Sequence, residues 1–146
     1  MPLITYFRTL LALHVLLIVG ELTSGQFTTS TLPEPLRNYL ELQYKNPEKT
    51  IGPNLEALSW VSLFGMSLLL VSMIGLWVLW RPARMLFTAY LLCLAVAIVL
   101  AGPLVESSLT SVLAFMNTII SGLILGMIYF SPLREHFDAP ELNPGR

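Results

Sequence analysis

Apolar residues in this chain gather into long uninterrupted runs. Three of these runs, residues 57–80, 85–104 and 108–130, contain no Asp, Glu, Lys, Arg or His. Each has about 20 residues or more, which is the length that an α-helix needs to cross the roughly 30 Å hydrocarbon core of a bilayer. Backbone groups in lipid must be hydrogen-bonded within their own segment, so the runs predict helices. Lipid-facing β-strands would alternate at every second residue, and stretches such as Leu68–Val71 do not.

The first apolar stretch, residues 3–22, has two interpretations. If the side chain of Arg8 extends to the membrane surface, the stretch is long enough to be a fourth span. Its apolar core over residues 9–20 also suits a signal peptide, with small residues at 23–25 for cleavage before Gln26. The chain is therefore expected to cross the membrane four times, or three times if the stretch is cleaved. Both interpretations place Gln26 on the outer side.

Positive charge predicts the orientation. Four arginines flank the predicted helix ends: Arg8, Arg81, Arg84 and Arg134. A path with four spans brings them to one side of the membrane, which the positive-inside rule makes cytoplasmic. Both termini would then be cytoplasmic, with an outer loop over residues 23–56 and a cytoplasmic tail over residues 131–146. The arginine bias suits a bacterial inner (plasma) membrane and equally the eukaryotic membranes that obey the same rule.

The outer loop contains one further predicted helix. Pro35–Tyr44 would begin with a proline in its first turn, and Leu36, Tyr39 and Leu40 would share one face. Such a helix would lie flat on the membrane or cap the bundle. The chain is thus predicted to be an all-α integral membrane protein with a single membrane domain over residues 1–146. We expect a four-helix transmembrane bundle, with this short extracytoplasmic helix between the first and second spans.

Composition supports the membrane interpretation and narrows the function classes. The 146 residues are 55% hydrophobic and 12% charged, and their mean hydropathy is +0.71. A soluble domain of this size has too little interior to hide so much apolar surface. The net charge of −1 and the lack of a basic stripe argue against a nucleic-acid partner. A single cysteine, Cys93, excludes an internal disulfide and a multi-thiolate metal site.

Small residues spaced four apart suggest how the helices pack, because helix association in lipid depends on close backbone approach. The third run carries one such stripe: Ala89, Cys93, Ala97 and Ala101. The fourth run carries another: Thr110, Ala114, Thr118, Gly122 and Gly126. We expect these stripes to face each other in a tight antiparallel hairpin. The Thr110 and Thr118 hydroxyls would bond to their own backbone or reach across the interface.

Two further packing features leave alternatives open. The second run has a small face of its own, wide enough for one helix contact: Ser62, Gly65, Ser72 and Gly75. The pair Gly122 and Gly126 forms a GxxxG motif, which in an apolar helix also fits a contact between subunits. Ordinary packing within one chain is the simpler interpretation of that motif.

Five polar residues are candidates for an ion or ligand path: His14, Glu21, Glu56, Glu106 and Asn117. His14 lies near the middle of the first stretch, where an imidazole can relay protons or ligate a metal or haem. The simpler interpretation is a neutral histidine bonded to a serine or a backbone carbonyl. Glu21 lies two helical turns further along the same face. Asn117, the one amide in the three charge-free runs, is expected to bond across to another helix at Ser62 or Ser67.

The three glutamates of that set would each lie at the outer end of a predicted helix. Folding could bring Glu21, Glu56 and Glu106 into a carboxylate ring that concentrates cations or binds a divalent ion. The simpler interpretation is three solvated acids at the membrane surface.

The sequence lacks the motifs of the common catalytic and nucleotide-binding sites, namely a Walker loop, GxSxG, HExxH and CxxC. No catalytic residue, metal or cofactor is therefore predicted. We expect a non-catalytic subunit, assembly factor or interaction partner of a membrane complex, whose partners are the lipid bilayer and other membrane subunits or further copies of itself. The alternative is a small homo-oligomeric channel or transporter whose path is lined by His14, Asn117 and the outer glutamates. A membrane enzyme ranks third, because nothing supplies a nucleophile with a base.

Overall fold

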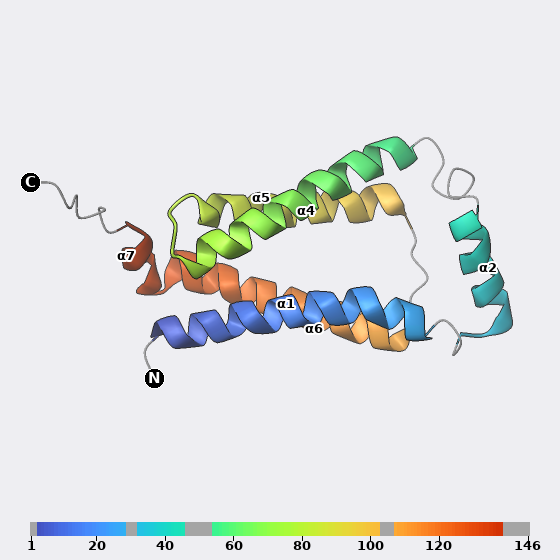
Figure 1. Ribbon diagram of the computed structural model, residues 1–146, viewed down its shortest axis with the longest axis horizontal. Coiled ribbons are helices and arrows are strands. Elements are labelled where there is room, and N and C mark those ends of the chain that lie inside the picture. The colour runs from blue at the N-terminus through green and yellow to red at the C-terminus, as the bar shows by residue number, and fades with distance from the viewer. Residues whose placement is uncertain (1–2, 29–31, 46–53, 103–106, 139–146) are drawn as a thin grey trace, which may run out of the picture.

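The computed structural model describes residues 3–28, 32–45, 54–102 and 107–138. Four long helices account for most of them: α1 (Leu3–Thr28), α4 (Leu55–Trp77), α5 (Ala83–Ala101) and α6 (Ser108–Phe130) (Figure 1). All four are long and apolar enough to cross a membrane, in α1 over Leu3–Ser24. Every regular element in the described ranges is a helix. The predicted all-α class with four long apolar helices is therefore confirmed.

Two short helices complete the described chain. They are α2 (Glu34–Lys45), between the first two long helices, and α7 (Leu133–Asp138), after α6. The predicted helix in the outer loop is thus confirmed. Figure 1 shows α2 apart from the long helices and running across their ends. Leu36 and Tyr39 are both exposed, so the predicted apolar face of α2 does not cap the bundle within this chain.

The long helices form two pairs, and α4 with α5 is the closer one. The helices are joined by a tight turn in which the Trp80 N–H donates to the Gly75 carbonyl at 2.7 Å. A Cβ added at Gly75 would come within 2.6 Å of the Ala83 Cβ, and one added at Gly65 would lie 3.5 Å from the Cβ of Cys93. The glycines of α4 therefore let the two backbones approach closely, as helix packing in lipid requires.

The second pair is α1 with α6. The hydroxyls of Ser24 on α1 and Thr110 on α6 are 3.0 Å apart, within hydrogen-bond distance. Thr110 thus reaches across an interface, although the interface is with α1. Thr118 makes the other predicted type of bond, since its hydroxyl donates to the Ala114 carbonyl of its own helix at 2.9 Å.

The predicted hairpin between the third and fourth runs is wrong. Cys93, in the middle of the α5 stripe, faces α4, and a Cβ added at Gly122 or Gly126 would meet nothing within 4 Å. The physical reason is that α4 has a small face of its own and joins α5 through the tighter turn, so α4 occupies the stripe. Helices α5 and α6 do meet at one end, where the hydroxyls of Thr88 and Tyr129 lie 3.0 Å apart.

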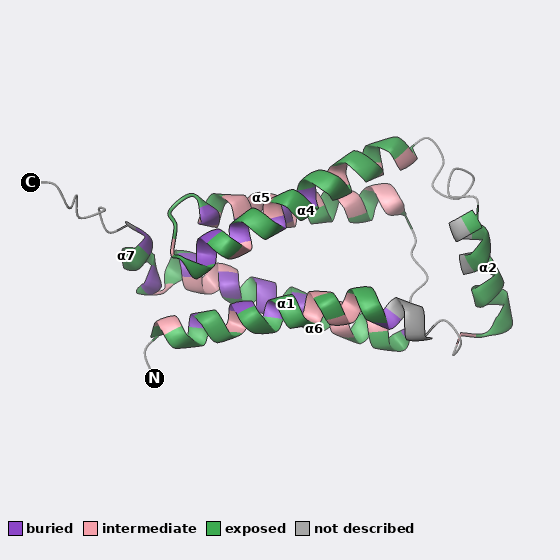
Figure 2. Cartoon of the chain, viewed as in Figure 1, coloured by how far each residue is buried: buried purple, intermediate pink, exposed green. Residues whose placement is uncertain are grey.

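Buried apolar side chains concentrate toward the end of the molecule where α1 begins and α6 ends (Figure 2). Phe7, Leu76, Phe87, Ile124 and Phe137 come from five different helices, and each is at most 2% exposed. We call this part the closed half, and the remainder of the four long helices, toward α2, the open half. Because five helices contribute to it, the closed half fixes the two helix pairs relative to each other.

The four arginines that flank the long helices lie at the closed end. The Arg8 guanidinium is 5.6 Å from the centroid of the Trp77 ring, which joins α1 to the end of α4. Arg81, Arg84 and Arg134 line one surface hollow beside Tyr129. The structure therefore gathers the arginines at one end, as a path with four spans predicts. That this end faces the cytoplasm stays a prediction.

Candidate functional site

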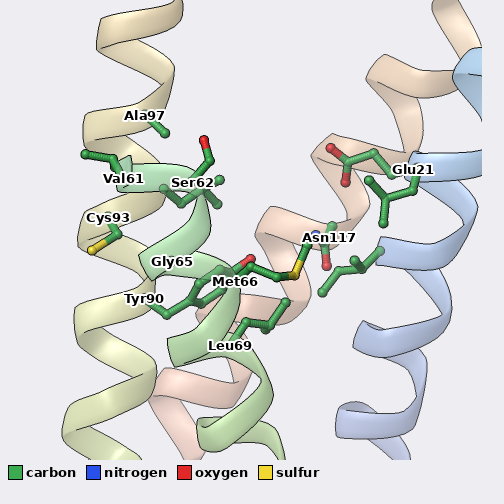
Figure 3. Close-up of a pocket in the computed structure, with 13 residues that line it drawn as sticks. Glu21, Val61, Ser62, Gly65, Met66, Leu69, Tyr90, Cys93, Ala97 and Asn117 are labelled. Atoms are coloured by element: carbon green, nitrogen blue, oxygen red, sulfur yellow. The ribbon is translucent and has the colours of Figure 1, made fainter. Parts of the chain in front are cut away.

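A cavity of about 210 Å³ lies in the open half, between the α1–α6 pair and the α4–α5 pair (Figure 3). All four long helices contribute to its wall. Most lining side chains are apolar, and the others carry oxygen, nitrogen or sulfur: Glu21, Ser62, Met66, Tyr90, Cys93 and Asn117. An apolar cavity with a few convergent polar groups is the usual form of a small-molecule site.

Asn117 places an amide in the wall of this cavity. The residue is 9% exposed, and its Oδ1 is buried without a hydrogen-bond partner in the described chain. Leaving a buried acceptor unsatisfied costs roughly 1–3 kcal/mol. Because the Oδ1 atom itself is covered, a molecule in the cavity reaches it only after the Asn117 side chain rotates.

His14 lies behind Asn117, where α1 packs on α6. Its imidazole is fully buried beside the Asn117 side chain, and its ring centroid is 5.8 Å from that of Phe87 in an edge-on arrangement. Neither ring nitrogen has a hydrogen-bond partner among the described residues. The interpretation of a histidine bonded to a serine or a backbone carbonyl is therefore wrong for the described chain. The Asn117 side chain is the polar group that acts on the imidazole, but the pair does not reach full hydrogen-bond geometry.

The buried serine hydroxyls of α4 and α6 do not satisfy these groups, because they bond to their own helices. The Ser121 hydroxyl donates to the Asn117 carbonyl at 2.8 Å, and that of Ser72 donates to the Leu69 carbonyl at 2.9 Å. Serine in a helix commonly makes this bond to the preceding turn. Because these hydroxyls donate to carbonyls of their own helices, they do not bond to the side chains of His14 and Asn117.

Glu21 and Tyr90 add oxygen atoms from opposite helix pairs. Glu21 is on α1 and partly buried, whereas Tyr90 is on α5 and 8% exposed. Both line the cavity, and the two side chains are close enough to interact electrostatically. A carboxylate is a hydrogen-bond acceptor, so the Glu21 side chain makes the cavity better suited to a donor or a small cation than to an anion.

The sequence also singled out Glu56, Glu106 and Ser67, and none of them is among the described residues that line the cavity. Glu56 is exposed on the first turn of α4 and does not line the cavity that Glu21 lines, while Glu106 lies outside the described residues. The described part of the chain therefore does not bring Glu21 and Glu56 into one site. Ser67 is not a partner of the amide, because its hydroxyl donates to the Leu63 carbonyl at 2.9 Å.

Sequence reasoning missed the contribution of Tyr90 to this site and assigned Cys93 to packing alone. Tyr90 had a usable signal. It is a tyrosine in the interior of an apolar run, whereas membrane helices usually place tyrosines near their ends. Cys93 had no such signal, because one thiol within a stripe of small residues looks like a packing residue. Within the described ranges, no three His, Cys, Asp or Glu side chains come together as a metal site would require.

The fold and the cavity define a class: an all-helical protein whose four apolar helices are compatible with a multi-pass membrane protein. Comparison of the chain with known protein families, curated proteins and solved structures found no match.

Proposed function

We propose that the chain acts in a membrane as a non-catalytic subunit, assembly factor or interaction partner of a larger membrane complex. The observation that carries the proposal is how little of each long helix is covered by the chain itself. Only 17% of the most apolar stretch is buried in α1, α4 and α5, and 28% in α6. One ordinary packing stripe about 100° wide would bury roughly 28% of a helix. Three of the four helices thus bury less than one such stripe.

The exposed part of these helices includes a face suited to close packing. Gly122 and Gly126 on α6 lie on a side where the chain places nothing within 4 Å of an added Cβ. Small residues on an outer face permit close approach by a helix of another subunit, whereas lipid needs no such smoothness. This supports an assembly in which α6 contributes to the contact.

Purification in a mild detergent tests the proposal. We expect the full-length chain to bring down a membrane partner at a fixed stoichiometry, and Gly122→Leu to weaken that association. Ala95→Leu is the matched control, because Ala95 is also exposed but lies on α5, away from the α6 glycines. A chain that remains a single monomer in detergent, in nanodiscs and after cross-linking in its own membrane would contradict the proposal.

A second candidate function is a small homo-oligomeric channel or transporter, and the cavity is the observation that favours it. Its wall combines Glu21, Tyr90 and Asn117 with apolar side chains between the two helix pairs. If this cavity is part of a path, Glu21→Gln should lower cation flux into liposomes by about tenfold, as expected when one charge-assisted contact is lost.

Glu56→Gln is the control for that flux measurement, because Glu56 is exposed and outside the cavity. Wild-type protein that gives no flux above empty liposomes would remove the transport function. Equal flux in wild type and Glu21→Gln would remove the cavity from the path. Neither result bears on co-purification of a partner, so the two candidate functions are tested separately.

A further inference from the structure

A surface hollow of about 600 Å³ lies at the closed end, away from the cavity between the helix pairs. We call it the arginine hollow, and its wall consists of six residues: Arg81, Pro82, Arg84, Met85, Tyr129 and Arg134. They come from the α4–α5 turn, the start of α5, the end of α6 and α7. The fold thus brings together arginines from segments about 50 residues apart in the sequence, and none of the described residues in the wall is acidic.

Contacts within the chain hold the wall in place. The Arg84 guanidinium lies 5.3 Å from the centroid of the Phe137 ring, and the Tyr129 hydroxyl is 3.0 Å from that of Thr88. Arg134 is held by α7, because Leu133 and Phe137 on that helix are at most 2% exposed. Arginines that are already positioned lose less conformational entropy when they bind a ligand.

The three positive charges favour an anion with several oxygen atoms. A guanidinium has five N–H donors in a planar fork that matches phosphate oxygens, so contacts already made within the chain do not use up its donors. An anion that enters the hollow can accept hydrogen bonds from more than one guanidinium at once. Glu135, the acidic neighbour of Arg134, is exposed and outside the wall.

The surroundings of the hollow favour a lipid as the source of the phosphate. Met85 is 75% exposed, and Phe130, next to Tyr129, is 91% exposed. Both residues belong to the ends of candidate spans, where lipid chains would cover them. Trp77 and Trp80 are also exposed at this end, as expected near a membrane surface. A headgroup in the hollow would therefore have apolar side chains beside it for its acyl chains.

We propose that the arginine hollow binds the phosphate of an anionic phospholipid headgroup. Arg81, Arg84 and Arg134 donate hydrogen bonds to the phosphate oxygens, and the exposed apolar residues at the ends of α5 and α6 contact the acyl chains. The site is separate from the cavity that contains Asn117, and it does not depend on the function proposed above.

Native mass spectrometry of the purified full-length chain tests the site by titration with phosphatidylglycerol and with phosphatidylcholine. We expect the wild-type chain to bind phosphatidylglycerol about tenfold more tightly, and Arg81→Gln with Arg134→Gln to remove most of that preference. Arg134→Gln alone and Arg8→Gln form the matched pair, because each removes one charge at this end and only Arg134 lines the hollow. Arg81→Lys with Arg134→Lys keeps the charge and loses the forked geometry, so its preference should be intermediate.

Three results would overturn the proposal. One is an equal affinity of the wild-type chain for the two lipids, and another is a loss in Arg8→Gln as large as in Arg134→Gln. The third is complete displacement of phosphatidylglycerol by millimolar inorganic phosphate, which would make the hollow a site for soluble phosphate. If the glutamine variant of the hollow fails to fold, the variant with two lysine substitutions replaces it. An unchanged lipid preference in that lysine variant would contradict binding of the phosphate by the forked guanidinium groups.

Discussion

The closed and open halves of the molecule are built from the same four helices and differ in what holds them. In the closed half, Phe7, Leu76, Phe87 and Ile124 are buried against one another, and α7 adds Phe137. In the open half the helices remain paired, but a cavity of about 210 Å³ separates the pairs. The buried side chains that line the cavity belong to Leu69, Tyr90 and Asn117, and two of these three carry polar groups. The comparison shows that large side chains join the two pairs, whereas small residues join the helices within a pair.

The difference between the two halves also suggests that they contribute differently to stability and to binding. Apolar burial gains little in lipid, so the closed half must be held by the fit of its side chains. The open half leaves the Oδ1 of Asn117 without a hydrogen-bond partner in the described chain, at a cost that a purely structural region would have no reason to bear. We therefore infer that the closed half holds the fold together and that the open half is where another molecule is bound.

Loss of a large side chain from the closed half should have the largest effect. Phe87→Ala leaves a cavity where α5 meets α1, and it should destabilise the chain by about 3 kcal/mol. Phe115→Ala is the control, because Phe115 on α6 is 67% exposed and its loss should change little. Equilibrium unfolding in mixed micelles measures both, and equal losses in the two variants would contradict the division into halves.

Added bulk between paired helices should have the next largest effect. Gly75→Leu would place a side chain against Ala83, where even a Cβ comes within 2.6 Å, and it should cost about 2 kcal/mol. Gly122→Leu should leave stability unchanged, because a Cβ there meets nothing within 4 Å. The same unfolding measurement applies. A large loss in Gly122→Leu, with none in Gly75→Leu, would restore the hairpin between α5 and α6.

Removal of the unsatisfied amide should have the smallest effect, and of the opposite sign. Asn117→Leu replaces a buried acceptor that lacks a partner, so the purified chain should gain roughly 1 kcal/mol of stability. Phe87→Ala and Asn117→Leu would then change stability in opposite directions. A loss of stability in Asn117→Leu would mean that the amide is satisfied within the chain, and the open half would lose its role as a binding region.

The long helices could be predicted from the sequence because their cause is local. Length and uninterrupted apolarity are enough to predict a helix in lipid, and α4, α5 and α6 follow the three charge-free runs closely. The partner of each helix could not be predicted in the same way. Small faces occur on α4, α5 and α6, and the spacing rule does not say which two meet. The tight turn at Trp80, with its bond to Gly75, determines the choice.

The candidate site was only partly predictable for the same reason. Glu21 and Asn117 could be identified because polar residues are rare in apolar helices, and both line the cavity. Tyr90 lines the same cavity because α5 packs on α4 and this pair faces the α1–α6 pair. Its place in the site therefore depends on which helices pair, and the sequence does not show this. The arginine hollow likewise depends on α7 folding back beside Tyr129, a contact that no local pattern in the tail indicates.

The pairing of α4 with α5 is tested most directly by a disulfide to the one native cysteine. In Gly65→Cys the new Cβ would lie 3.5 Å from the Cβ of Cys93, which is within the range for a disulfide. Mild oxidation in membranes should therefore cross-link this variant within one chain, detected as a shift in gel mobility that a reductant reverses. Thr118→Cys, on the helix that a hairpin would place opposite Cys93, should stay reduced. A disulfide in Thr118→Cys together with none in Gly65→Cys would contradict the account.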